Sequence, residues 1–230
     1  MKTIGLIGGM SWESTVTYYQ LINDYVKDCL GGLHSAKLLL YSVDFEEIER
    51  WQASGDWDKS AQRLTEIAKK LEGAGADFIV ICTNTMHKVA PQMEKELSVP
   101  ILHIADATAD ALLAAGIRTV GLLGTKYTMT QDFYKSRLER RGLSVVIPDE
   151  AGVEQVNNVI YQELCLGVIR EESRACYRQI IDQLKAKGAQ GVILGCTEIG
   201  LLISQEDSSL PVFDTTRIHG EAAAQKAIEE

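Results

Sequence analysis

The feature that most constrains the fold of this chain is an internal repeat. Three stretches of the first half recur in the same order in the second half: "KTIGLIGGMSWESTVTYY" from Lys2 and "RTVGLLGTKYTMTQDFY" from Arg118, "GADFIVICTNT" from Gly75 and "GAQGVILGCTE" from Gly188, and "VPILHIAD" from Val99 and "LPVFDTTR" from Leu210. The offsets drift slowly, from 118 − 2 = 116 through 188 − 75 = 113 to 210 − 99 = 111. Ordered matches at a nearly constant offset predict a duplicated structural unit.

Each half alternates short apolar runs with longer amphipathic segments. In the first half the runs "TIGLIGG", "AKLLLYSV" and "DFIVIC" are each followed by a segment of helical character. This alternation predicts an α/β fold with parallel strands and crossover helices. We therefore expect two pseudo-symmetric parallel-sheet α/β domains related by duplication. If the domains face each other across a pseudo-twofold axis, the loops at the carboxyl ends of their strands line one cleft, which is the expected active site.

Composition excludes several classes of protein. The 230 residues are long enough for one large domain or two small ones, and the net charge of −9, without a basic cluster, argues against a nucleic-acid surface. No segment approaches the roughly 20 apolar residues of a membrane span, and the N-terminal apolar run breaks at Gly8-Gly9, so we expect a soluble, cytoplasmic protein. Five cysteines without a CxxC pair and four histidines without zinc spacing predict free thiols and no metal.

The repeat decides which residue at the end of each central strand faces a ligand. With the offset of 113, Cys196 corresponds to Thr83, because 196 − 113 = 83, and Cys82 corresponds to Gly195. Neighbouring residues of a strand point to opposite sides, so Cys82 is predicted to be core at the strand end, although it remains a rival proton donor to Thr83.

Small hydroxyl and amide residues follow both strand ends. We expect Thr83-Asn84-Thr85 and Cys196-Thr197-Glu198 to cap following helices, whose dipoles attract a carboxylate and favour a thiolate. Cys196 is then a plausible base or nucleophile, and an inert thiol beside a cap is the alternative. The glycine turns after the first strand of each half allow close backbone approach but match neither a dinucleotide nor a Walker motif.

These motifs resemble the cofactor-independent aspartate/glutamate racemases. The resemblance rests on "IGLIGGMSWEST", "CTNTMH", "GLLGTKYTM" and "GCTEIG", and it covers nearly the whole chain. It implies an isomerase that needs no cofactor such as pyridoxal phosphate. It also implies a two-base mechanism, in which one base removes the α-proton of an amino acid and an acid on the other face returns a proton. Dimers are common among such enzymes, so a homodimer is a possible assembly.

The family usually supplies two catalytic cysteines, but this chain has Thr83 at the first position. A thiol has a pKa of about 8.5, whereas a threonine hydroxyl does not ionise usefully near neutral pH. We therefore expect Cys196 to abstract the α-proton of the L-enantiomer and Thr83 to act as a weak opposing donor. L-substrates should exchange or racemise, while D-substrates should react poorly, as in the L-aspartate/glutamate-specific subgroup that carries the threonine.

The resemblance also implies a set of substrate-binding residues. Asn84, Thr85, Thr125 and Thr197 map to positions that hold the α-carboxylate and amine, with helix capping as the alternative. Three further candidates are less direct. Gln52 either contacts the ligand or is solvated, Met10 either walls the cleft or packs in the core, and Glu198 either orients Cys196 or offsets a helix dipole. Asp44, His87, Lys126 and Arg217 form a second rank.

Two departures leave the substrate open. Archaeal aspartate racemases clamp the side-chain carboxylate with an arginine and a lysine, but here Arg50 is only the nearest arginine to the matching position, and Cys165 aligns with the lysine. A broad-specificity racemase is therefore an alternative. A cysteine-dependent isomerase or hydrolase and a catalytically idle protein that binds small carboxylates are two others.

By the resemblance, the first domain is expected to span residues 1–114 plus about 205–230, and the second about 115–204.

Overall fold

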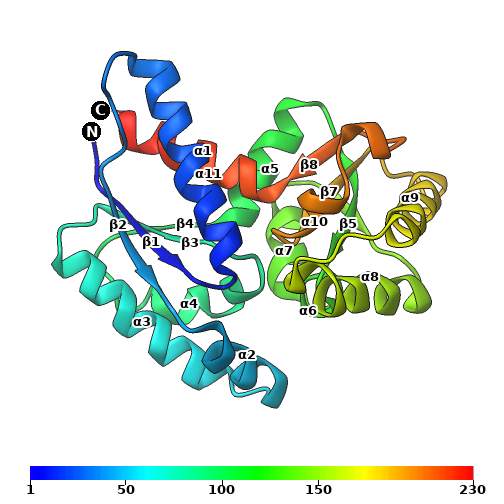
Figure 1. Cartoon of the computed structure of the whole chain (residues 1–230), viewed down its shortest axis with the longest axis horizontal. Coiled ribbons are helices and arrows are strands. Elements are labelled where there is room, and N and C mark those ends of the chain that lie inside the picture. The colour runs from blue at the N-terminus through cyan, green and yellow to red at the C-terminus, as the bar shows by residue number, and fades with distance from the viewer. Residues whose placement is uncertain (230) are drawn as a thin grey trace. The chain divides into compact units, whose positions relative to one another are not determined.

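The computed structural model describes residues 1–229, and the chain divides into two compact units. The first unit comprises Met1–Ile104 together with the chain from Thr216 onward, and the second comprises Ala105–Thr215. Each unit is built on its own four-stranded parallel sheet flanked by helices (Figure 1). The predicted duplicated α/β fold with parallel strands is therefore confirmed.

The sheet of the first unit has the strand order β2-β1-β3-β4. Its strands are β1 (Ile4–Gly8), β2 (Leu38–Ser42), β3 (Phe78–Ile81) and β4 (Ile101–Leu102). Its helices are α1 (Trp12–Leu30), α2 (Phe45–Ser54), α3 (Trp57–Gly73), the 3₁₀ helix η1 (Thr85–Val89), α4 (Ala90–Met93) and α11 (Thr215–Ile228).

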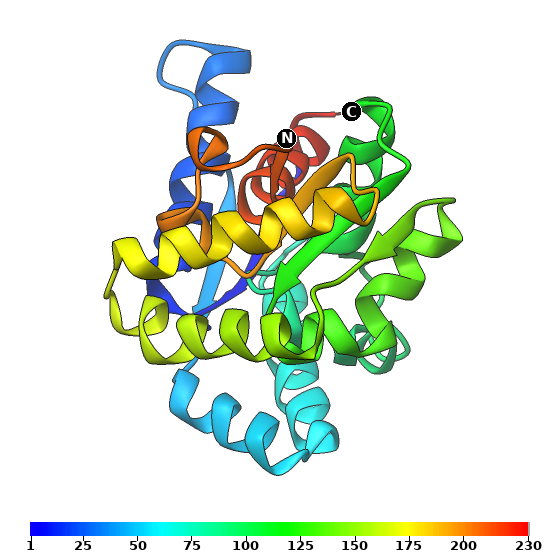
Figure 2. The same cartoon turned by 90° about the vertical axis from the view of Figure 1, so that its right-hand side faces the viewer.

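The sheet of the second unit has the equivalent order β6-β5-β7-β8. Its strands are β5 (Thr119–Gly124), β6 (Ser144–Val146), β7 (Gly191–Gly195) and β8 (Val212–Asp214). Its helices are α5 (Ile104–Ala114), α6 (Lys126–Thr130), α7 (Asp132–Arg140), α8 (Glu150–Gln162), η2 (Leu164–Leu166), α9 (Glu171–Ala186), α10 (Ile199–Leu202) and η3 (Gln205–Asp207). Figure 2 shows α8 and α9 running in front of β5 and β7, and both helices contact β5.

Strand register reproduces the offsets of the sequence repeat. Ile4 pairs with Phe78 in the first sheet and Val120 pairs with Gly191 in the second, which gives 120 − 4 = 116 and 191 − 78 = 113. The edge strands follow the same rule. Ile79 of β3 pairs with Ile101 of β4, and Val192 of β7 pairs with Val212 of β8, which gives an offset of 212 − 101 = 111 for the edge strand. Thr83 and Cys196 are therefore structurally equivalent positions.

The first sheet is buried on both faces, as parallel sheets usually are. Alternate residues of β3 separate into two core clusters. Phe78, Val80 and Cys82 pack with α1 and α11, whereas Ile79 and Ile81 pack with α3. The same period of two places Cys82 in the core and fixes the direction in which the chain leaves the strand.

The unit boundaries differ from the predicted ones by about ten residues at each crossing. Strand β8 pairs with β7, so it belongs to the second sheet and not to the first domain, where residues from about 205 had been assigned. Helix α5 belongs almost wholly to the second unit, whereas α11 belongs to the first. Each half of the repeat thus gives its last helix, but not its last strand, to the other unit.

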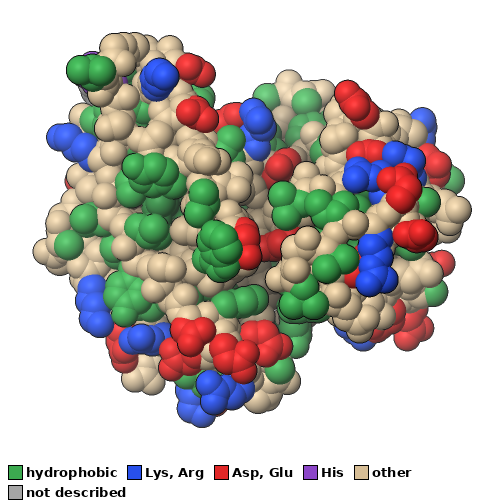
Figure 3. All heavy atoms as spheres, in the orientation of Figure 1, with side chains coloured by type: hydrophobic (Ala, Val, Ile, Leu, Met, Phe, Trp, Pro, Cys, Tyr) green, Lys and Arg blue, Asp and Glu red, His purple; other side chains and the backbone are tan. Residues whose placement is uncertain are grey.

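Helix α1 begins where the Ser11 side chain accepts a hydrogen bond from the Ser14 N–H. The side of α1 that faces away from the core carries Trp12, Val16 and Tyr19, which are exposed. Figure 3 shows hydrophobic side chains over this part of the surface.

Within residues 1–229, no helix has the length and apolar character that crossing a bilayer would require.

Candidate active site

Polar loops follow the two central strands of each sheet at the carboxyl edge. In the second unit Gly124 of β5 pairs with Gly195 of β7, so Thr125 and Cys196 leave neighbouring strands at the same level. In the first unit β1 and β3 are paired up to Ile7 and Ile81, and Thr83 follows that edge. The ligand edge expected of a parallel sheet thus carries candidate residues in both units.

Cys196 is held by a carboxylate. Its Sγ donates to Glu198 Oε2 at 2.9 Å, and the Thr197 hydroxyl donates to the same oxygen at 2.9 Å. Cys196 is 9% exposed and Glu198 is 6% exposed, so the pair is largely shielded from water while Thr197 is half-buried. The Glu198 carboxylate is therefore in position to orient the thiol, and that role stays a prediction.

The thiol is not activated in the predicted way. Burial first, and then the negative charge of Glu198, raises the pKa of Cys196 well above the ordinary value. Cys165 also contributes to this rise, so it lies in the electrostatic neighbourhood of Cys196. Cys196 thus rests as a thiol and not as the expected thiolate.

The helices after the two strand ends are short or irregular. The segment after Thr83 is the 3₁₀ helix η1, and α10 after Cys196 has four residues. Neither Asn84 nor Glu198 makes a side-chain capping hydrogen bond at these starts. The predicted side-chain caps are therefore not formed by Asn84 or Glu198.

Thr83 lies in a tight turn at the end of β3. Its N–H donates to the Ile81 carbonyl at 2.8 Å, and its own carbonyl lies 2.7 Å from His87 Nδ1. Thr83 is half-buried, while Asn84 and Thr85 are buried. Cys82 is fully buried in the core, and burial raises the pKa of its thiol, as expected of a residue that faces away from the ligand edge.

Gln52 and Met10 lie in the interior of the first unit. Gln52 on α2 is buried, and its Nε2 lies 2.9 Å from the Sδ atom of Met86, which follows Thr85 in η1. The solvated alternative for Gln52 is therefore wrong, because it packs against the segment that carries Asn84 and Thr85. Met10 belongs to the same apolar cluster as Met86, so it serves packing.

Thr125 caps a helix in the second unit. Its side chain accepts from the Thr128 N–H at 3.3 Å at the start of α6, which is the capping alternative considered for it. The glycine turn of the first unit also has a packing role. Gly9 has a φ of 89°, its N–H donates to the Thr15 hydroxyl at 2.8 Å, and a Cβ there would lie 2.3 Å from the Val43 carbonyl oxygen.

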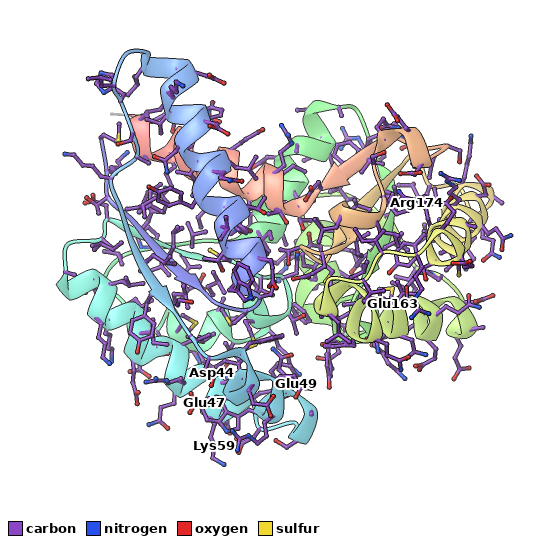
Figure 4. All side chains as sticks on the ribbon, viewed as in Figure 1. Asp44, Glu47, Glu49, Lys59, Glu163 and Arg174 are labelled. Carbon is purple, nitrogen blue, oxygen red and sulfur yellow. The ribbon has the colours of Figure 1, made fainter. Side chains whose placement is uncertain are left out.

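Most residues of the second rank have structural partners. Asp44, labelled in Figure 4, caps α2 by accepting from the Glu46 N–H at 3.2 Å. Lys126 forms an ion pair with Glu154, and Arg217 lies 3.3 Å from Glu221. His87 also has structural partners, and one of them is the Thr83 carbonyl, 2.7 Å from its Nδ1.

Other residues near Cys196 carried no sequence signal. Burial raises the pKa of Tyr177, and Cys196 is the next largest contributor, which places this α9 residue near the thiol. Arg174, on the same helix and labelled in Figure 4, donates to the Leu202 carbonyl and, at 3.1 Å, to Asp207. Helix α9 therefore supports the segment that follows Glu198, and only the folded chain brings these residues together.

The two-sheet fold and the equivalent strand-end loops define a duplicated parallel α/β protein with candidate ligand-binding residues at the carboxyl ends of its strands. The sequence profile of the Asp/Glu/hydantoin racemase family matches residues 7–223, and the chain belongs to this family. Because racemases are isomerases, the predicted family and enzyme class are both confirmed at this level.

Several relatives share the whole fold. A structure of a candidate Asp/Glu racemase from Yersinia pestis is 58% identical, covers 100% of both chains and has a TM-score of 0.94. An aspartate racemase homologue from Pyrococcus horikoshii is 39% identical over 100% of both chains, with a TM-score of 0.87. The broad specificity amino-acid racemase RacX of Bacillus subtilis is 25% identical over 93% of this chain and 92% of its own length.

Proposed function

We propose that the protein is a cofactor-independent amino-acid racemase acting on aspartate and glutamate, in which Cys196 and Thr83 address opposite faces of the substrate Cα. The observation that carries this proposal is the buried Cys196–Glu198 hydrogen bond at a position equivalent to Thr83. Racemisation requires one group that takes a proton and one that returns it from the other side. A thiol that is hydrogen-bonded to a carboxylate is suited to removing the α-proton.

Glu198 is proposed as the proton acceptor of the resting thiol. The S–H proton moves to Glu198 Oε2, and the thiolate then takes the α-proton of the L-amino acid, which regenerates the thiol. The substrate ammonium near this pair offsets its negative charge and lowers the cost of forming the thiolate. The raised pKa of Cys196 in the free protein is consistent with this order of events, because the thiolate then forms only once the substrate ammonium is bound beside it.

The carbanion then receives a proton on its other face from the Thr83 hydroxyl. Thr83 recovers this proton from solvent, and Glu198 releases the proton it took. The proposed holders of the α-carboxylate and amine are Asn84 and Thr85 in one unit and Thr125 and Thr197 in the other. The half-buried Thr83 and Thr197 combine access to substrate with fixed backbone.

The unequal acid–base pair sets the kinetics. A hydroxyl is a poor base, so return of the proton by Cys196 competes with donation by Thr83. While the carbanion persists, the Cys196 S–H exchanges its proton with solvent through Glu198, so its return to the same face exchanges the α-proton without racemisation. L-substrates should therefore exchange their α-proton with solvent faster than they racemise. The two enantiomers have equal free energy, so kcat/KM for racemisation must be the same in both directions, and the asymmetry is expected in α-proton exchange.

A second candidate is a racemase of broad specificity. Arg50 is exposed on α2, whereas Ile48 and Gln52 of that helix are buried, so Arg50 lies away from the Gln52 side. Cys165, near Cys196, is a thiol and not a cation. These two positions therefore do not supply the expected clamp for a side-chain carboxylate, which favours tolerance of uncharged side chains.

Proton NMR in deuterated water tests the proposal. L- and D-aspartate, L- and D-glutamate and a panel of uncharged amino acids are incubated with the wild-type protein and its variants. Loss of the L-form α-proton signal is expected, abolished in Cys196→Ser and retained in the control Cys82→Ala. Thr83→Cys should extend fast exchange to D-forms.

The same experiment separates the other classes. If no amino acid exchanges its α-proton, the racemase proposal is refuted, and a thermal shift with dicarboxylates would then indicate a binding protein. A covalent adduct on Cys196 detected by mass spectrometry would instead indicate a cysteine-dependent isomerase or hydrolase.

A further inference from the structure

His87 lies directly against the turn that carries Thr83. The imidazole is 1% exposed, its Nδ1 is 2.7 Å from the Thr83 carbonyl oxygen, and its Nε2 is 3.3 Å from the backbone nitrogen of Ile104. A backbone N–H can only donate, so Nε2 is an acceptor, and the proton of the neutral ring is on Nδ1. Both ring nitrogens are therefore used, and the tautomer is fixed by its partners.

The backbone of His87 holds the same turn. Its N–H donates to the Asn84 carbonyl at 3.1 Å, while the Thr83 N–H donates to the Ile81 carbonyl at 2.8 Å. The peptide group before Thr83 is thereby bonded to β3, and the peptide group after it is bonded to His87 in η1. The backbone from which the Thr83 side chain projects is thus held by three hydrogen bonds, two of which involve His87.

The other side of His87 is anchored to the segment between β4 and α5. Ile104 begins α5, and the preceding Leu102 carbonyl accepts from His219 Nε2 at 2.8 Å. His219 Nδ1 in turn accepts from the Tyr18 hydroxyl at 2.8 Å. The ring centroids of His103 and His219 lie 4.5 Å and 5.6 Å from that of His87, so the imidazole is packed in a cluster that leaves it little freedom to rotate.

The second unit has no such imidazole at the equivalent position. With the offset of 113, His87 corresponds to Gly200, because 87 + 113 = 200. The Cys196 carbonyl accepts instead from the Ile199 backbone N–H at 3.1 Å. The thiol has a side-chain acceptor in Glu198 that orients it, whereas the turn of Thr83 is held through its backbone by His87.

We propose that His87 is a positioning residue for the Thr83 half of the reaction, holding the Thr83 carbonyl against the β4–α5 segment so that the hydroxyl points at the substrate. The inference rests on the proposed racemase function. Because His87 holds Thr83 and not Cys196, its loss should slow donation of a proton by Thr83 more than abstraction by Cys196.

The test measures two rates on the same samples. With L-aspartate or L-glutamate in deuterated water, NMR gives α-proton exchange and chiral chromatography gives formation of the D-form. His87→Ala is expected to lower the ratio of D-form production to exchange about tenfold. His87→Asn retains a donor near the Nδ1 position and should recover most of the ratio.

His219→Ala is the matched control, because it removes a buried imidazole of the same cluster that bonds Leu102 and not Thr83. It should change exchange and racemisation by similar factors. If His87→Ala changes the ratio less than twofold, or if His219→Ala changes it as much, the positioning role is refuted.

Failure of the proposed function can be told apart from failure of this inference. Absence of exchange in the wild-type protein refutes the function and the catalytic part of the inference together. Exchange in the wild type with an unchanged ratio in His87→Ala refutes the inference alone. Nitrogen-15 NMR of the histidine rings gives a readout besides activity: a proton on Nε2 of His87 would overturn the assigned hydrogen bonds.

Discussion

Acidification should destabilise the first unit through His219, a histidine that the fold keeps neutral. His219 is fully buried, and burial lowers its pKa from 6.5 to about 4, although its bond to the Leu102 carbonyl partly opposes this shift. The folded state thus binds its proton less readily than the unfolded state. The contribution of neutral His219 to the free energy of unfolding is fully present above pH 6.5 and is lost as the pH falls from 6.5 toward 4.

The size of the effect follows from the shift. The difference of 6.5 − 4 = 2.5 pKa units corresponds to about 3 kcal/mol of unfolding free energy once the pH is below 4. At pH 5.5, where the unfolded histidine is mostly protonated and the folded one is not, about 1 kcal/mol should already be lost.

Urea unfolding between pH 7.5 and pH 4.5 measures this loss. His219→Gln can keep a donor toward Leu102 but cannot titrate, so its unfolding free energy should fall less steeply with acid than that of the wild type. The control His34→Gln alters an exposed histidine and should follow the wild type. Parallel curves for the wild type and His219→Gln, or a measured His219 pKa near 6.5, would refute the reasoning.

Three further predictions concern single contacts. Glu198→Gln removes the acceptor of the Cys196 proton, and α-proton exchange of the L-substrate should fall about 10²- to 10⁴-fold by NMR; an unchanged rate would remove Glu198 from the mechanism. Tyr18→Phe leaves His219 Nδ1 without this donor, and urea unfolding should show a loss of about 1–3 kcal/mol, whereas full stability would contradict the assigned bond. Gly9→Ala places a Cβ at a φ of 89° against the Val43 carbonyl, so a loss of about 2 kcal/mol or more is expected in the same assay, and a neutral result would show that the turn can relax.

The duplicated fold could be predicted because the repeat is written in local patterns. Apolar runs of strand length recur at offsets of 116, 113 and 111, and the register of both sheets has the same offsets. The boundaries between the units were harder to predict from the sequence. They depend on which sheet β8 joins and on where α5 and α11 pack, and these are long-range choices without a local signal.

The candidate site shows the same limit. Strand alternation placed Cys82 in the core, because the period of two is a local property of extended chain, and the offset of the repeat aligned Thr83 with Cys196. The expected thiolate at a helix start was wrong. Burial of the thiol and then the closeness of the Glu198 carboxylate raise the pKa of Cys196, and neither is fixed by sequence spacing alone.

The sequence by itself determined the duplicated parallel α/β architecture, the equivalence of Thr83 and Cys196, and the family, since these follow from periodicity, repeat and motif. Only the tertiary structure decided the protonation of Cys196, the burial of Gln52 and the place of His87 beside Thr83. Electrostatic and hydrogen-bonding environments depend on distances between groups far apart in the chain, and a packed interior sets those distances.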